Sequence, residues 1–266
     1  MVRGGNCLPE LQSGRACTEY PIKSNCNGEE FSWMKKSNSY LLHKGVIDGE
    51  SYLIIATMHS NNSKTGDMVQ ICILLEDTDP VAGVLSGLDA QTICQGCPFA
   101  SGEGCYVNLG QSPLSIWKAY HRGNVPFLRV KDYPVMFSGR KVRFGSYGNP
   151  TLIPLRIVQR IASIADGFTG YFHNWRELGK AKARKWNKFF MASTETVDSL
   201  LLAKEWGLRV FHASPVKPDG LLECVADSHG KECIDCMLCE GGKNAKDIWI
   251  NPHGSKKKKA VKAATN

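Results

Sequence analysis

Cysteine is the residue type that most clearly points to chemistry in this sequence, because seven of its 11 cysteines fall in two short segments. The C-terminal segment has the pattern C-x8-C-x2-C-x2-C and comprises Cys224, Cys233, Cys236 and Cys239. Thiolates are soft ligands that suit iron–sulfur clusters and zinc. Closely spaced thiolates favour a cubane, whereas zinc commonly uses two separated C-x2-C pairs. We therefore predict a 4Fe–4S cluster, with zinc as the alternative and His229 as a substitute for one ligand.

The second cysteine segment has the pattern C-x2-C-x7-C and comprises Cys94, Cys97 and Cys105. Three thiolates leave one iron of a cluster open to a substrate or to S-adenosylmethionine, although the C-x3-C-x2-C spacing of radical S-adenosylmethionine enzymes is absent. One alternative is a zinc site completed by an N-terminal cysteine or by a histidine, His59 or His121. Another is a single merged site in which this segment shares Cys224. The spacing leaves one and two metal sites equally open.

The other cysteines are not clustered. Cys72 lies in the apolar run 71–75 and is predicted to be a core residue. Cys7, Cys17 and Cys26 lie in an N-terminal arm without apolar periodicity. An odd number of cysteines excludes a complete disulfide framework within one chain, and no apolar secretory region follows Met1. We therefore expect a reducing cytoplasm and metal-bound thiolates.

The composition, 42% hydrophobic and 22% charged, is that of a soluble globular protein and excludes collagen-like, coiled-coil and wholly disordered chains. The sequence lacks a run of about 18 apolar residues, so no membrane span is expected. It also lacks a Walker A loop, a G-x-G-x-x-G turn, an H-E-x-x-H helix and a G-x-S-x-G elbow. These common catalytic classes are therefore not indicated.

The positive charge of the chain, +8, is concentrated between residues 140 and 190, where eleven lysines and arginines face two acidic residues. Arg176, Lys180 and Arg184 recur at the spacing of one helix face. With the lysine tail, 256–262, this stripe could bind a phosphate backbone. The alternative is an ordinary solvated helix face. Nucleic-acid binding with a structural zinc is thus the second functional hypothesis.

The elements that must position these residues are predicted from periodicity. Runs 39–46 and 52–57 flank Asp48-Gly49, which predicts a type I′ hairpin, and 69–75 is a third strand. A helix is expected from Pro113 to Gly123. Four further strands, at 141–144, 168–172, 188–191 and 209–211, alternate with helices at 151–165, 174–186 and 196–206. This alternation predicts parallel strands in a doubly wound sheet or a (β/α) barrel, and we favour a partial TIM-barrel-like fold preceded by a β-rich region.

Polar side chains follow each of the four strands, where such folds place their chemistry. They are Ser146, Tyr147, His173, Asn174, Ser193, Thr194, His212 and Ser214. If the protein is an enzyme, Tyr147, His173 and His212 should face the open iron of the three-cysteine site. Helix capping is the alternative role for the serines and asparagine.

The chain is expected to divide into four parts. They are an irregular arm at 1–38, a β-rich region at 39–90, a metal-binding (β/α) barrel-like domain at 91–242 and a disordered basic tail at 243–266.

The order of these motifs resembles that of a bacteriophage family of unknown function, the gene product eighty-eight family. The motifs that carry the resemblance lie within about residues 90–242 and are Cys105-Tyr106, 143–150, 169–175, 191–194, 207–211 and the four-cysteine segment. The resemblance implies a phage-encoded protein of the host bacterial cytoplasm. It also implies a barrel distantly similar to radical S-adenosylmethionine proteins, with cysteines of both segments as cluster ligands. It implies no particular reaction.

Overall fold

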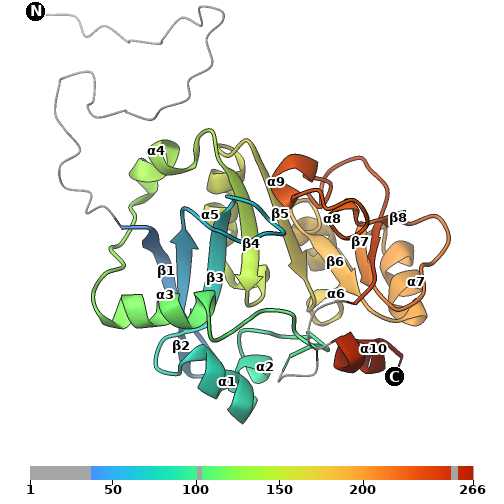
Figure 1. The fold of residues 1–266 in the computed structure, drawn as a ribbon, viewed down its shortest axis with the longest axis horizontal. Helices are drawn as coiled ribbons and strands as arrows, with labels where there is room; N and C mark the ends of the chain where they lie inside the picture. The colour runs from blue at the N-terminus through green and yellow to red at the C-terminus, as the bar shows by residue number, and fades with distance from the viewer. Residues whose placement is uncertain (1–36, 101–103, 253–256, 266) are drawn as a thin grey trace, which may run out of the picture. The chain divides into compact units, whose positions relative to one another are not determined.

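The computed structural model describes residues 37–100, 104–252 and 257–265 (Figure 1). The three N-terminal cysteines, Cys7, Cys17 and Cys26, lie outside the described residues. The described residues form a mixed α/β structure around a nine-stranded sheet, with the strand order β1-β2-β3-β4-β5-β6-β7-β9-β8. The strands are β1 Ser39–Ile47, β2 Glu50–Thr57, β3 Val69–Leu75, β4 Lys141–Tyr147, β5 Gly167–Phe172, β6 Met191–Thr194, β7 Val210–Ala213, β8 Leu222–Glu223 and β9 Ile248–Ile250.

The first three strands are antiparallel, and β1 and β2 form the expected hairpin. Asp48 and Gly49 have φ angles of 49° and 86° and join Ile47 to its partner Glu50. Positive φ at both central positions defines a type I′ turn, whose twist matches that of the strands. The prediction from the Asp-Gly pair is confirmed.

From β3 onward the strands are parallel, as the alternation of strands and helices predicted. Strands β4 to β7 follow one another in chain order and are connected by α5 (Leu155–Ala162), α6 (Trp175–Trp186) and α7 (Val197–Glu205). Right-handed crossovers place such helices on one face of a sheet; α5 and α6 lie behind it in Figure 1. The order does not reverse, so the sheet is not doubly wound. Within the described residues no pairing joins β8 to β1, and the sheet is open.

The remaining helices lie in the connections outside this regular part. They are α1 Pro80–Ser86, α2 Leu88–Gln91, α3 Ser112–His121, α4 Tyr133–Phe137, α8 Val225–Ser228, α9 Cys233–Cys236 and α10 Lys257–Thr265, with 3-10 turns at Val130–Asp132 and Pro150–Leu152. None of the helices in the described part of the chain combines the length and the apolar character that crossing a bilayer requires.

Apolar burial follows the predicted periodicity. All seven residues of β3 are buried, and α5 buries Ile157, Val158 and Ile161. Each such side chain stabilises the fold by about 1.5–3 kcal/mol when it leaves water. Thr196 and Ser199 form a capping box at the start of α7, and Gly207, with φ 69°, follows its end. The expected boundaries of this helix are therefore confirmed.

Two elements start later than expected. The helix expected from residue 151 begins at Leu155, because Pro154 lacks an N–H and its ring disfavours a helical conformation at the preceding residue. The strand expected at 188–191 begins at Met191. The amides of Phe189 and Phe190 instead donate to the carbonyl of Trp186 in a turn. Apolar composition therefore placed this strand about three residues too early.

The expected division of the chain needs correction. The regions 39–90 and 91–242 share one sheet, and residues 37–266 cluster into one unit. The segment 243–266 was expected to be a disordered tail. Instead, β9 (Ile248–Ile250) lies between β7 and β8, and 257–265 forms α10. Three apolar residues in a polar context gave too short a signal, and their strand is defined by pairing with distant partners.

Candidate functional site

A cavity of about 860 Å³ lies over one face of the sheet. Alternate residues of a strand point to the same face, so β4, β5, β6 and β7 each contribute side chains to it. Those lining the cavity from the parallel strands and their ends include Arg143, Ser146, Tyr171, His173, Ser193 and Phe211. The cavity therefore brings together three of the polar residues predicted to follow separate strands, Ser146, His173 and Ser193, whereas Tyr147, Asn174, Thr194, His212 and Ser214 do not line it.

The first cysteine segment lies at the carboxyl ends of β4 and β5. The Cys94 amide donates to the Asp89 carbonyl at 2.7 Å, and the Asn149 amide donates to the Ile93 carbonyl at 2.7 Å. Gly96, with φ 66°, lies against the backbone of Asn174, where a Cβ would come within 2.9 Å. The turn between Cys94 and Cys97 is thus fixed by residues that follow the two strands.

Electrostatic interactions link the three thiols of this segment. Burial raises the pKa of Cys94 well above its ordinary value, and the nearby charges of Cys97, Asp89 and Cys105 act in the same direction. Tyr147 donates its hydroxyl hydrogen bond to Asp89. Burial, together with Cys94 and Asp89, also raises the pKa of Tyr147. Cys94, Cys97 and Cys105 therefore form one group, with Tyr147 beside it.

His173 lies between this cysteine group and the cavity. Its Nδ1 lies 3.3 Å from Glu195 Oε1, and the ring of Phe99 packs edge-on against it at 6.3 Å. Burial lowers the pKa of His173, but the charge of Cys97 and hydrogen bonds to Cys97 and Glu195 raise it well above the ordinary histidine value. His173 and Tyr147 therefore both lie beside the first cysteine group.

Glu195 was not identified from the sequence as part of a site. It is 4% exposed and accepts a hydrogen bond from Ser193 Oγ at 3.1 Å. The sequence offered one signal: Glu195 closely follows a strand end and lies next to the helix cap. His212 has a different environment, because its Nδ1 lies 2.9 Å from Thr194 Oγ1 and burial lowers its pKa. The hydrogen bond to Thr194 gives His212 a partner other than the cysteines.

The second cysteine segment is anchored near the amino ends of the parallel strands. The Cys233 amide donates to the Lys64 carbonyl at 2.9 Å, and the Ile234 amide donates to the Thr65 carbonyl at 3.1 Å. Lys141, the first residue of β4, donates from Nζ to the Ile234 carbonyl at 2.6 Å. Thus the polar 61–66 loop and β4 together hold the start of α9.

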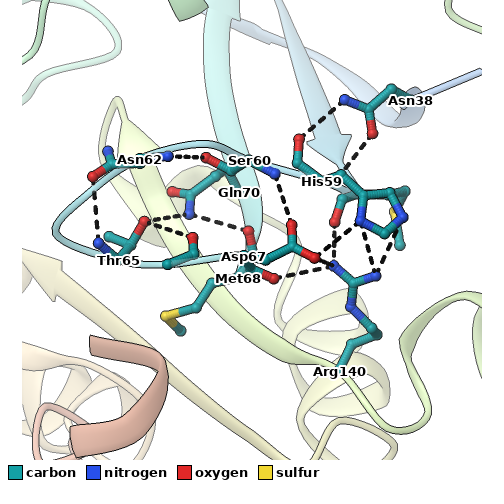
Figure 2. Close-up of polar contacts among 11 residues, drawn as sticks. Asn38, His59, Ser60, Asn62, Thr65, Asp67, Met68, Gln70 and Arg140 are labelled. Carbon is teal, nitrogen blue, oxygen red and sulfur yellow. Dashed lines mark hydrogen bonds and ion pairs between the residues drawn. The ribbon is translucent and has the colours of Figure 1, made fainter. Parts of the chain in front are cut away.

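The loop between β2 and β3 is itself ordered by a polar network, shown in Figure 2. Asp67 accepts a hydrogen bond from the Ser60 amide at 2.9 Å and pairs with His59 at 3.0 Å and with Arg140 at 3.4 Å. Although partial burial raises it, the hydrogen bonds from Ser60 and His59 hold the pKa of Asp67 below its ordinary value. Gln70 donates to Thr65 Oγ1 at 3.0 Å. The network therefore positions the Lys64 and Thr65 carbonyls, which accept the hydrogen bonds from the start of α9.

Arg209, the residue before β7, holds the loop that follows the second cysteine segment. Its guanidinium is 9% exposed and donates to the backbone carbonyls of Leu238, Glu240, Ala245 and Lys246. Four charge-assisted bonds to one loop define its path. They place Cys239 in a buried cluster with Met191 and Ile248. From the sequence alone, this arginine was expected only to start a strand.

The fourth thiol of the group belongs to Cys224, which directly follows β8. The Cys224 amide donates to the Trp249 carbonyl at 2.8 Å, and the side chain packs against the cluster that contains Cys239. Burial raises the pKa of Cys239 to about 12, although the Tyr171 hydroxyl opposes this by hydrogen bonding. Burial also raises the pKa of Cys233, with Cys224 and Cys236 acting in the same direction. Cys224 therefore groups with the second segment.

The donor chemistry of the second group fits a thiolate-ligated centre. In the described part of the chain, no three Cys, His, Asp or Glu side chains already stand at the distances of a shared metal ion. No disulfide joins two of the described cysteines. Four thiols from two elements nevertheless converge within electrostatic range, two of them with pKa values raised by burial. Metal binding replaces thiol protons and supplies the positive charge that buried thiolates need.

The other candidate ligands have partners elsewhere. His121 lies 2.8 Å from the Glu76 carbonyl and packs on Trp117 at 4.0 Å. His59 belongs to the Asp67 network. Cys72 is a buried residue of β3, as expected, and burial raises its pKa to about 12.

The basic helix α6 is interrupted. Gly179 has φ 72° and ψ 160°, which are not helical values. Arg176 therefore lies in a separate turn, with its guanidinium 4.4 Å from the centre of the Trp175 ring. Lys180 and Arg184 follow the break, and the Arg184 guanidinium lies against Gly207. The three residues do not form the continuous stripe that their spacing predicted.

No protein-family model, curated protein or solved structure matches this chain. The function is therefore argued from the site alone.

Proposed function

We propose that this protein is an iron–sulfur protein in which Cys224, Cys233, Cys236 and Cys239 hold a 4Fe–4S cluster. The observation that carries the proposal is the convergence of one thiol that follows β8 with three from the α9 segment, next to the buried guanidinium of Arg143. A bound cluster supplies electron transfer. Arg143 and the Tyr171 hydroxyl would offset the negative charge of its thiolates. Zinc at the same four thiols is the alternative.

Cys94, Cys97 and Cys105 would hold a second cluster, or a zinc ion, with one ligand position not filled by a cysteine of that segment. Support comes from their mutual electrostatic interactions and from His173, which lies between Cys97 and the cavity. A bound centre would replace the hydrogen bond of Cys97 to His173. His173 would then retain Glu195 as its charged partner.

Within this proposal the sheet is the arc of an incomplete (β/α) barrel. Its support is the succession of parallel strands in chain order, from β3 to β7. The resemblance to the phage family, and with it the host bacterial cytoplasm, stays a prediction.

Anaerobic purification with measurement of iron, sulfide and zinc tests the proposal. A brown protein whose visible absorption is bleached by dithionite is expected. Cys236→Ser should remove the iron of this cluster, which is all of the iron if there is one centre and about half if there are two, since a cluster rarely tolerates loss of a thiolate. Cys72→Ala is the matched control and should keep it. A colourless protein with stoichiometric zinc would overturn the iron–sulfur assignment.

The iron content of variants in the first cysteine segment shows whether the protein holds one metal centre or two. If there are two, Cys97→Ser should lower the iron content by about half while the second group keeps its cluster. Unchanged iron in Cys97→Ser would remove this segment from the ligand set.

Nucleic-acid binding with a structural zinc is the second candidate, supported by exposed lysines on α10 (Lys257, Lys258 and Lys259) and on α6. Phosphate contacts make affinity depend steeply on salt. Binding to duplex and single-stranded DNA should therefore weaken linearly on a log–log salt plot, with a shallower slope after changing Lys257, Lys258 and Lys259 to alanine. The triple variant of Arg176, Lys180 and Arg184 tests the α6 contribution. Identical slopes for the wild type and both variants would reject this candidate.

A further inference from the structure

Arg143 is a buried cation without an acidic partner. It is 7% exposed, and its strand neighbours in register are Gln70 on β3 and Thr169 on β5. Among the described residues, no aspartate or glutamate lies within ion-pair distance of its guanidinium. Buried charges are normally paired or bind a ligand, because removing an ion from water is costly. An anion bound next to Arg143 would therefore compensate its buried positive charge.

The groups around the Arg143 guanidinium include two tyrosines and three cysteines, of which Cys72 and Cys239 also interact with it electrostatically. Nη2 donates to the Tyr106 hydroxyl at 2.7 Å, and the guanidinium lies 5.0 Å from the centre of the Tyr171 ring. Cys233 lies within electrostatic range. Arg209 provides the contrast, since four backbone carbonyls satisfy that buried guanidinium. Arg143 has five N–H donors, and among the described residues its side-chain partners are the hydroxyls of Tyr106 and Tyr171.

The surroundings of Arg143 have the size and lining of a small-molecule site. The cavity of about 860 Å³ reaches Arg143 and lies within the usual range for such sites, roughly 300–1,000 Å³. Aromatic rings line it next to the arginine, and Tyr171 and Phe211 pack together with centroids 4.2 Å apart. Ser193 and His173 add polar groups. Thr169 Oγ1, beside Arg143 in the sheet, is buried and has no hydrogen-bond partner among the described residues.

We propose that the cavity binds a small aromatic oxyanion, a carboxylate or a phosphate, with Arg143 as its charge partner. The planar guanidinium fork matches either group with two parallel hydrogen bonds. The rings of Tyr106, Tyr171 and Phe211 accept the flat apolar part of the molecule. The cavity also reaches Cys224 and Cys233, so this site borders the proposed cluster, but it does not depend on the identity of the metal.

Three probes of similar size test the site on the full chain as purified. Benzoate and phenyl phosphate carry the two candidate anions, and benzamide is their neutral counterpart. Calorimetry or ligand-observed NMR should give binding of at least one anion, with benzamide about tenfold weaker or more. The stronger of the two anions identifies carboxylate or phosphate. Equal binding of benzamide, or no binding of either anion, would overturn the proposal.

Substitution of the arginine separates this site from the cysteines. Arg143→Gln should weaken anion binding by about tenfold or more. Because Arg143 also faces thiols of the second group, the metal content of the variant is measured alongside. Arg160→Gln on the outer surface of α5 is the matched control and should bind as the wild type does. If Arg143→Gln does not fold, Arg143→Lys, which keeps the charge but loses the fork, should still weaken binding severalfold. Undiminished binding in the folded variant would refute the assignment, and so would equal weakening by Cys236→Ser, which keeps Arg143.

Discussion

Asp89 and Tyr147 form a buried polar pair beneath the first cysteine segment. Asp89 lies in α2 and is 1% exposed, and its partner Tyr147 ends β4. Burial raises the pKa of Asp89 to about 6, although the Tyr147 hydroxyl opposes the shift. The folded chain thus holds this proton more tightly than the unfolded chain does. Protonation of Asp89 therefore stabilises the fold.

The sign of this linkage predicts a pH dependence. The contribution of Asp89 is complete below its ordinary pKa of 3.8 and is lost as the pH rises to about 6. The free energy of unfolding should fall by about 3 kcal/mol over this interval. Urea unfolding of Asp89→Asn should lack this fall, because a neutral amide does not titrate. Asp166→Asn, at an exposed carboxylate, is the control and should keep the wild-type profile. Identical profiles for Asp89→Asn and the wild type would contradict the assignment.

At the scale of elements, α6 illustrates how one residue changes the geometry of a charged face. Gly179 adopts a φ and ψ combination that is essentially confined to glycine. No other atom lies within 4 Å of the position where its Cβ would stand, so the cost of a side chain there is a backbone cost alone.

Gly179→Ala should therefore destabilise the protein by about 1–3 kcal/mol, measured by urea unfolding. In a regular helix the same change would stabilise by about 0.5–1 kcal/mol, so the sign of the effect decides between a broken and a continuous helix. Gly110→Ala, at a position without positive φ where a Cβ would make an ordinary contact with Asn108 Oδ1 at 3.7 Å, should change stability by less than about 0.5 kcal/mol. If Gly179→Ala stabilises the protein, the helix is continuous, and Arg176, Lys180 and Arg184 share one face.

The 238–246 loop depends in the same way on Arg209. Arg209→Met would leave four carbonyls without their donor, and we expect a loss of about 3 kcal/mol or more. Since the loop positions Cys239, the metal content should also fall. Arg209→Lys keeps the charge but loses the planar guanidinium fork. Its stability and its metal content should both lie between those of the wild type and those of Arg209→Met. Wild-type stability of Arg209→Met would show that the loop is held by other contacts.

At the scale of the whole molecule, the sheet is completed by a strand near the end of the chain. β9 pairs with β7 and β8, and its residues Ile248 and Trp249 are buried. Asp247, just before it, accepts a hydrogen bond from the Val210 amide at 2.8 Å. Arg209 directly precedes β7 and Cys224 directly follows β8. Both strands therefore pair with β9.

Two truncations test this dependence. Ending the chain at Gly242 removes β9, and we expect loss of cooperative unfolding by circular dichroism together with aggregation, because β7 becomes an exposed edge. Ending it at Pro252 removes α10 alone and should preserve the sheet. If the chain ending at Gly242 unfolds with the wild-type midpoint, β9 is not required.

The sequence by itself determined the features that depend on neighbouring residues. Asp48-Gly49 specified the hairpin, Thr196 and Gly207 bounded α7, and the C-x2-C-x2-C spacing supplied a candidate ligand set. The alternation of strands and helices likewise predicted the parallel sheet. Each of these signals lies within one or two turns of the chain, where local sterics and hydrogen bonding act.

Only the tertiary structure decided what depends on distant pairing. It joined Cys224 to the group of Cys239, set Glu195 against His173, and left Arg143 facing a cavity without an acid. It also assigned β9 to the sheet rather than to a tail. Strand order and burial arise from the packing of the whole chain, and a residue's counter-charge is set by which neighbours that packing brings to it.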